Sequence, residues 1–483
     1  MFVNKRKGIL FIICLALLSC ACGDTATVQE EPGELDFVGL NAAPELTYEV
    51  PVSAPHIMVD QVGYLTDGEK TAVFKGSKLP EDFEVIHVDT GEVVYNGTIR
   101  ESQKTKAGDE LVGYGDFTEL TGEGTYYIQC GMLGRSYNFA IGDQVYDEVF
   151  ANAMEVFKET REGDKLMQGG WFTDSEGNQE VSVVCETMMV LLTAYELYPS
   201  AFIETADTAA SEPELLSLLR SQTEWLLLLQ NEDDGGVCEG LSVYPAQGEA
   251  EYRIGEVDPE ATACFAAAMA KFSYIYQGYD QQYASGCLRA ADRAWKYIDR
   301  LQYEEEKDIS DILFSAAAEL YRASGQQSYH SAARQFLKEG VNPGESHWDT
   351  YGTITYLSTR QYVNKEYCGI IMKQLMAYAE DISVNARGGI YFTEGNESLD
   401  NTKVLLWNMV ILTVADYVIT NHEYATVIEN HQHYILGCNA MAACLAEAAD
   451  CDKMWNAQDC IQDDLFTNAC YVCMMSQILQ NNK

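Results

Sequence analysis

The sequence predicts two domains, a small all-β sandwich followed by an all-α toroid of six helical hairpins. The chain has 483 residues, too many for one ordinary core, and 47% of them are apolar. Apolar residues alternate with period two before about residue 141 and recur with helical spacing afterwards. We therefore expect a signal peptide at residues 1–22, a flexible tether at 23–54, the sandwich at 55–143 and the toroid at 144–483.

The N-terminal residues have the pattern of an export signal. The basic run Lys5–Lys7 precedes the apolar stretch Ile9–Leu18. The small residues before Cys20 resemble the lipobox of bacterial lipoproteins, so we expect Cys20, or alternatively Cys22, to be acylated. A plain secretory peptide is the other interpretation. Residues 23–54 are rich in Glu, Pro, Ala and Thr and are typical of a tether. We expect an exported protein on the outer face of a bacterial membrane, which it contacts through the lipid alone.

The charge of the chain limits its ligands. A net charge of −43 makes nucleic acid an unsuitable partner and favours neutral or cationic ligands over anionic polymers. No Asp-rich loop has the spacing of a calcium site, and we expect neither metal nor cofactor. Six cysteines between Cys438 and Cys473 are expected to form one or two disulfides, or to stay reduced in an anaerobic setting.

The sandwich is predicted from short alternating runs separated by turn signals such as Asp89-Thr90-Gly91. This spacing is typical of antiparallel strands in two packed sheets. The runs are Ile57–Val59, Thr71–Phe74, Phe83–Val88, Val93–Tyr95 and Thr125–Ile128.

The toroid is predicted from twelve helical segments. The segments that begin at Pro213 and Pro259 are apolar on more than one face, which indicates helices packed between neighbours. Six such hairpins can close into a double ring with a groove among the loops at one end. The segments begin near Tyr146, Val181, Pro213, Pro259, Tyr279, Ile309, Gln327, Thr350, Lys365, Thr402, Glu423 and Asp464.

Short motifs occur in a fixed order along both domains. Together they resemble the family 9 glycoside hydrolases, which include many cellulases, and the immunoglobulin-like module that often precedes their catalytic domain. The resemblance covers nearly everything after the tether. It rests on Val59–Tyr64, Asp116–Thr118, Gly124–Tyr127, Gly169–Trp171, Ala194–Pro199, Asp234–Val237, Ala316–Ala323 and Tyr434–Asn439.

The resemblance implies hydrolysis of β-1,4-glucan or a related oligosaccharide with inversion. Two carboxyl groups about 6.5 to 9.5 Å apart serve as base and acid in such a reaction. The family's Asp-Ala-Gly-Asp run carries the base, and here Thr173 and Glu176 occupy its two Asp positions. We expect Glu176 to be the base, with Asp174 as a substitute. Both are equally compatible with solvated loop acids.

The position of the family's acid is changed as well. Counting six residues back from Asn468 leads to Gln462, which cannot donate a proton as a carboxylic acid does. The neighbouring Asp463 is the expected substitute acid, although paired acids before a helix are commonly caps. Cys438 stands where the family often has an Arg that grips the sugar.

Aromatic rings that stack on sugars are the remaining expected ligand contacts. Trp171, Trp348 and Trp455 are predicted to lie in loops or at helix ends, and we assign them, with Gln462, to substrate binding. Trp225, Trp295 and Trp407 fall on apolar helix faces and are expected in the core.

Three functions remain open from the sequence. The first is an inverting hydrolase that uses Glu176 or Asp174 with Asp463. The second is a catalytically inactive lipoprotein that binds glycan or a protein. The third is a structural component of the envelope. Changed catalytic positions weaken the first, because function depends on the site rather than the fold.

Overall fold

The computed structural model describes residues 55–481, apart from 106–109, 160–164, 204–211, 245–250, 302–307, 397, 420–421, 450 and 452–459. The predicted signal peptide, its Cys20, the tether and Trp455 lie outside these residues. No helix within the described ranges is long and apolar enough to cross a membrane.

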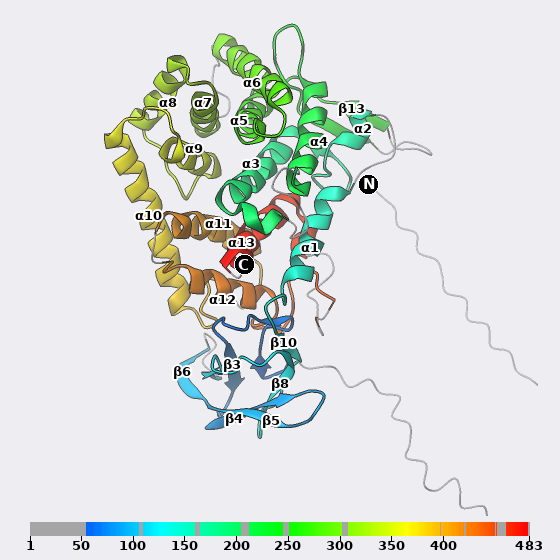
Figure 1. Ribbon diagram of the computed structural model, residues 1–483, viewed down its shortest axis with the longest axis vertical. Helices are drawn as coiled ribbons and strands as arrows, with labels where there is room; N and C mark the ends of the chain where they lie inside the picture. The colour runs from blue at the N-terminus through cyan, green and yellow to red at the C-terminus, as the bar shows by residue number, and fades with distance from the viewer. Residues whose placement is uncertain are drawn as a thin grey trace, which may run out of the picture. The chain divides into compact units, whose positions relative to one another are not determined.

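The N-terminal part of the described chain consists of two β-sheets packed face to face (Figure 1). One has the strand order β1-β3-β7-β6, and the other has the order β2-β10-β8-β4-β5, with β9 beside β8. Neighbouring strands are antiparallel except β2 and β10. The strands are β1 Ile57–Met58, β2 Gly63–Tyr64, β3 Thr71–Gly76, β4 Asp82–His87, β5 Val93–Thr98, β6 Arg100–Lys104, β7 Leu111–Asp116, β8 Gly124–Cys130, β9 Gly134–Arg135 and β10 Phe139–Ile141.

Alternation along the strands builds the sandwich core. In β8, Tyr126, Ile128 and Cys130 are buried while the residues between them are more exposed, as period two requires. Tyr64 contacts Phe117 and Phe139 edge to face at 5.2 and 5.4 Å, so aromatic rings fill the space between the sheets.

The rest of the described chain is mainly helical (Figure 1). Each of the twelve predicted segments is present and begins within three residues of its predicted start. The helices are α1 Asp147–Glu155, α2 Lys165–Gly169, α3 Val181–Leu197, α4 Glu214–Leu229, α5 Pro259–Tyr276, α6 Gln281–Leu301, α7 Ser310–Ser324, α8 Gln327–Glu339, α9 His347–Ser358, α10 Lys365–Gly388, α11 Thr402–Val418, α12 Ala425–Ile435 and α13 Leu465–Asn481, with 3₁₀ turns η2 Val156–Lys158, η3 Pro199–Phe202 and η4 Ile461–Asp463.

In the sandwich, strands β2, β6, β7, β9 and β10 lie outside the predicted runs, and two features of the helical part were not predicted either. One is the short helix α2. The other is a three-stranded antiparallel sheet of β11 Gln179–Glu180, β12 Gly240–Tyr244 and β13 Glu251–Ile254. Because β11 leads directly into α3, this sheet lies at the N-terminal end of that helix.

The odd-numbered helices from α3 to α13 are the most buried ones, and we call them the inner helices. Each of α3, α5 and α7 packs on the next inner helix, α11 packs on α13, and α13 packs on α3. Helices α9 and α11 meet through Trp407, whose Nε1 donates to the carbonyl of Gly344 at 3.0 Å and whose ring contacts Tyr351 at 5.7 Å. In Figure 1, α4, α6 and α8 lie outside α3, α5 and α7.

A buried ionic network connects α3, α5 and α7. The Lys271 ammonium lies 3.2 Å from a Glu196 oxygen and 3.3 Å from a Glu319 oxygen. The Arg322 guanidinium contacts the same two carboxylates at 2.6 and 2.7 Å. Burial alone would raise the pKa of Glu196, but the charges of Lys271 and Arg322 together lower it. The network therefore favours the ionised form of Glu196 and ties the three helices together.

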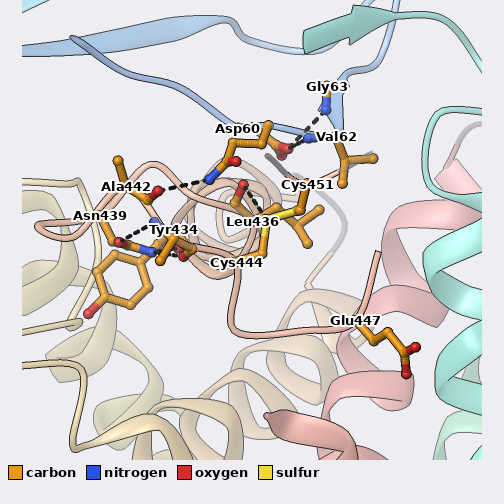
Figure 2. Close-up of a disulfide and its surroundings, with 12 residues drawn as sticks. Asp60, Val62, Gly63, Tyr434, Leu436, Asn439, Ala442, Cys444, Glu447 and Cys451 are labelled. Carbon is orange, nitrogen blue, oxygen red and sulfur yellow. Dashed lines mark hydrogen bonds between the residues drawn. A yellow bond between two sulfur atoms is a disulfide. The ribbon is translucent and has the colours of Figure 1, made fainter. Parts of the chain in front are cut away.

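The sandwich is joined to the helical part through Asp60 and Gln61. The Asp60 carboxylate accepts hydrogen bonds from the backbone amides of Val62 and Gly63 and lies 2.9 Å from His433 Nδ1. The Gln61 amide nitrogen donates to the carbonyl of Ala442 at 3.0 Å. The Gln61 contact at Ala442 holds the connection between α12 and α13 against the sandwich (Figure 2), while Asp60 contacts α12 itself.

One disulfide lies in this connection. Cys444 and Cys451 are bonded, with 6.4 Å between their Cα atoms (Figure 2). The expectation of one or two bridges among the late cysteines is therefore met by one within the described chain. Cys438, Cys460, Cys470 and Cys473 are free thiols.

Candidate active site

The loop between Trp171 and β11 carries the two predicted base residues. Asp174 Oδ1 accepts hydrogen bonds from the backbone amides of Glu176, Gly177 and Asn178 at 2.9 to 3.0 Å, and its Oδ2 accepts from the Asn178 side chain at 2.6 Å. Although burial opposes it, these hydrogen bonds lower the pKa of Asp174. The Asp174 carboxylate therefore shapes the loop and is a weaker proton acceptor, and its role as a substitute base stays a prediction.

Glu176 differs from Asp174 because its carboxylate is not engaged by the loop. Its side chain is exposed, and its carboxylate has no hydrogen-bond partner within the described ranges. Thr173, at the other changed position, donates from its hydroxyl to the carbonyl of Asn178 at 3.0 Å and supports the same turn. Glu176 is thus the one predicted base position with a carboxylate free to contact water.

The predicted acid region lies in η4, directly before α13. Gln462 Oε1 accepts from the backbone amide of Glu447 at 3.1 Å and from the Cys460 thiol at 2.9 Å. Gln462 Nε2 is buried and lacks a partner among the residues that the structure describes. Gln462 therefore links η4 to the connection that carries the disulfide.

The two aspartates after Gln462 both make contacts with neighbouring residues through their carboxylates. Asp463 accepts from the backbone amide of Cys460 at 3.2 Å and caps η4. Asp464 lies 2.6 Å from the Lys403 ammonium and accepts from the amide of Thr467 at 2.9 Å. Burial would raise the pKa of Asp464, but these partners lower it. Asp463 therefore serves as a cap, and its role as a substitute acid stays a prediction.

The tryptophans predicted to bind sugar are mostly buried. Trp171 is 2% exposed, and its Nε1 donates to the carbonyl of Phe157 at 2.9 Å. Its ring offers no face to a ligand, which corrects its assignment to substrate binding. Trp348 is 8% exposed and packs edge to face on Tyr351, so little of its ring is available. Trp455 lies outside the described residues.

A cluster that the sequence analysis missed lies at the N-terminal ends of four inner helices. Glu186 comes from α3, His347 from α9, Trp407 from α11 and Phe466 from α13. His347 Nδ1 lies 2.8 Å from Glu186 Oε1. The imidazole ring is 3.9 Å from the Trp407 ring and stacks on Phe466 at 5.1 Å with an interplanar angle of 11°. Pairing between helices far apart in sequence leaves no local pattern by which these residues could have been found.

A second carboxyl near this cluster has an altered acidity. Asp349, in the first turn of α9, is buried, and its Oδ2 accepts from the backbone amide of Asn342 at 2.6 Å. Burial raises the pKa of Asp349 to about 6, the hydrogen bond from Asn342 opposes this, and the charges of Asp311 and Asp308 add to it. A carboxyl of this kind changes its protonation close to neutral pH, but it is only 7% exposed.

A polar cavity of about 280 Å³ lies at the N-terminal ends of α3 and α5, next to the Glu176 loop. Four of its ten lining residues are acidic and none is basic, so anionic sugars are disfavoured there. The lining consists of Gln179, Glu180, Ser182, Glu239, Gly240, Leu241, Ser242, Asp258, Glu260 and Ala261. Asp258 caps α5 by accepting from the amide of Ala261 at 2.7 Å.

Fold and site together define a sandwich module followed by a helical domain with polar and aromatic residues at one end of its inner helices. The chain belongs to glycosyl hydrolase family 9, whose profile matches residues 126–446. Residues 52–135 match the cellulase N-terminal Ig-like domain. The first domain is therefore immunoglobulin-like, as the sequence motifs indicated.

The chain is similar to known endoglucanases. It is 25% identical over 456 residues to endoglucanase D of Acetivibrio thermocellus, covering 79% of this chain and 71% of that protein. It is 22% identical over 473 residues to a xyloglucan-specific endo-β-1,4-glucanase of Bacteroides ovatus, covering 80% of this chain and 79% of that protein.

Solved structures share its fold. A metagenome-derived family 9 endoglucanase superimposes with a TM-score of 0.75 at 21% identity, over 88% of this chain and 98% of that one. A family 9 protein of Bacteroides ovatus superimposes with a TM-score of 0.73 at 18% identity, over 89% of this chain and 99% of that one.

Proposed function

We propose that this family 9 protein binds β-1,4-glucan or a related oligosaccharide at the N-terminal ends of its inner helices, without efficient hydrolysis. Its named relatives are endoglucanases, one of them specific for xyloglucan. The cavity beside the Glu176 loop is polar and acidic, which suits a neutral ligand rich in hydroxyl groups.

The state of the carboxyl groups carries this proposal. Inverting hydrolysis needs a base and a protonated acid about 6.5 to 9.5 Å apart. Glu176 offers a free carboxylate, whereas Gln462 cannot act as an acid and Asp463 is a cap. One half of the required pair is therefore missing from the family positions.

A second candidate is slow hydrolysis with inversion, with Glu176 as the base. The exposed, unpartnered carboxylate of Glu176 favours it. A displacement of about 1 Å in a catalytic group costs on the order of a hundredfold in rate, and Glu176 is one methylene longer than the family's Asp.

We also propose that the six helical hairpins close into a toroid whose groove holds the ligand. The packing of α13 on α3 supports this closure. Export and acylation of Cys20 complete the proposal, with residues 23–54 as the tether. Labelling of the expressed protein with a fatty-acid analogue, lost in Cys20→Ala, tests the anchor.

One pair of assays separates the two functions. Reducing-sugar release from mixed-linkage glucan and carboxymethyl cellulose is measured for the native protein and for Glu176→Gln, and migration is followed in native gels containing either glucan. Retarded migration without release supports the binding protein. Release that Glu176→Gln abolishes supports the enzyme. If neither retarded migration nor sugar release were observed, the result would favour a protein-binding or structural role in the envelope.

A further inference from the structure

The Glu186–His347 pair lies between the two segments that hold the predicted catalytic positions. Glu186 is in the second turn of α3, the helix that follows the Glu176 loop. Phe466 is in the first turn of α13, directly after the segment with Gln462. His347 contacts both, at 2.8 Å from the Glu186 oxygen and 5.1 Å between its ring and that of Phe466. The imidazole is thus placed across the same end of the inner helices.

The orientation of the imidazole is fixed on three sides. The Glu186 carboxylate accepts the proton of Nδ1, which selects the tautomer with its lone pair on Nε2. Trp407 and Phe466 cover the ring, and Trp407 is itself held by its hydrogen bond to Gly344. The His347 ring therefore presents one nitrogen in one direction.

That nitrogen is open to a ligand. The His347 side chain is 34% exposed and Glu186 is 24% exposed. Nδ1 makes the one hydrogen bond of this imidazole within the described ranges, so Nε2 is unpartnered there. The buried His431 differs, since it uses both ring nitrogens in hydrogen bonds.

The acidic cavity adjoins this pair along one helix face. Ser182 lines the cavity, and Glu186 follows it four residues later on the same face of α3. Glu186, and with it His347, therefore lies one helical turn along α3 from the wall of the cavity. Hydrogen bonds to hydroxyl groups beside aromatic walls are how proteins bind uncharged sugars.

We propose that His347, oriented by Glu186 and walled by Trp407 and Phe466, is a sugar-binding subsite that hydrogen-bonds a hydroxyl group of a neutral β-1,4-linked oligosaccharide through Nε2. This rests on the proposed function and names the residue that anchors the ligand. The subsite uses none of the positions predicted to be catalytic.

Isothermal titration calorimetry with cellohexaose tests the subsite. His347→Ala is expected to raise Kd about tenfold, since one hydrogen bond and its fixed geometry are lost. Glu186→Gln keeps the side-chain shape but frees the ring tautomer, and we expect a rise of about threefold. The matched control is His422→Ala, because His422 also pairs with a carboxylate, Asp416 at 3.0 Å, but at the opposite end of α11. Its Kd should equal that of the native protein.

A second measurement does not depend on a variant that folds. In the native protein, the His347 ring resonances are expected to shift on addition of cellohexaose, while those of His422 stay unchanged. The subsite alone would be overturned if the native protein bound cellohexaose, if His347→Ala bound it with the same Kd, and if the His347 resonances of the native protein did not shift. Absence of binding by the native protein to cellohexaose and to the polymeric glucans would overturn the proposed function and the subsite with it.

Discussion

Asp60 of the sandwich and His433 of α12 form a buried side-chain hydrogen bond, with 2.9 Å between Oδ2 and Nδ1. Their side chains are 0% and 6% exposed. Burial raises the pKa of Asp60, and the hydrogen bond and charge of His433 counteract that rise. The Tyr146 hydroxyl donates to the carbonyl of Gly63 at 2.8 Å beside them. The motif shared with family 9 modules thus has a physical role, which is to hold the two domains together.

Asp60→Asn is therefore expected to weaken the junction. The amide oxygen still accepts from Val62 and Gly63, but His433 Nδ1 then faces an amide nitrogen in place of a carboxylate oxygen, and loss of a partner for a buried polar group costs about 1 to 3 kcal/mol. Differential scanning calorimetry should show a lower Tm and a separate transition for the sandwich. Asp89→Asn, an exposed aspartate of the sandwich, is the control and should unfold like the native protein. An unchanged single transition in Asp60→Asn would exclude the role of the pair.

Lys271→Ala is predicted to destabilise the helical domain by about 3 kcal/mol or more, because it leaves the buried Glu196 and Glu319 with Arg322 as their remaining cation. Because the folded pKa of Glu196 is lowered, its stabilisation is complete above the ordinary pKa of glutamate and is lost as pH falls through the lowered value. Urea unfolding from pH 7 to pH 3 should thus show a difference between the proteins that shrinks in acid. Lys296→Ala removes an exposed pair with Asp292 and should cost below about 1 kcal/mol.

The helices could be predicted from the sequence, whereas most of the site could not. Periodicity is a local signal, so α3 at Val181 and α5 at Pro259 begin where the pattern placed them. Trp171 is held by hydrogen bonds with Phe157 and Gln222, which lie 14 and 51 positions away and are not visible in its neighbours. The Glu186–His347 pair joins residues 161 positions apart, which a single sequence cannot bring together.

The raised pKa of Asp349 predicts a pH dependence of stability that is opposite in sign to the one predicted for Glu196. A folded pKa of about 6, above the ordinary 3.8, means that the protonated carboxyl is favoured in the folded state. The native protein then loses stability as pH rises from about 4 to about 6, and this loss is on the order of 3 kcal/mol. Asp349→Asn removes the titration, so its Tm relative to the native protein should increase over that interval. Asp299→Asn, exposed on α6, should follow the native profile. A constant difference between Asp349→Asn and the native protein would contradict the assignment.

The disulfide is expected to support ligand binding through Gln462. The Cys444–Cys451 bridge closes a short loop, and beside it the amide of Ile461 donates to the carbonyl of Leu445 at 2.9 Å. The amide of Glu447 also donates to Gln462 Oε1 at 3.1 Å. Without the bridge, the unfolded chain gains conformational freedom, and the folded connection between α12 and α13 loses one of its restraints.

Reduction of the native protein should therefore lower its unfolding free energy by about 2 kcal/mol and weaken cellohexaose binding severalfold. The double variant Cys444→Ser/Cys451→Ser should match the reduced native protein and should not respond to reductant, because the other described cysteines are free. Thermal unfolding and calorimetric titration, each with and without a phosphine reductant, measure both effects. Mass spectrometry of the oxidised protein verifies the bridge independently. If the double variant bound cellohexaose as tightly as the oxidised protein, Gln462 would hold its position without the bridge, and the sandwich contact from Gln61 to Ala442 would be sufficient to order this connection.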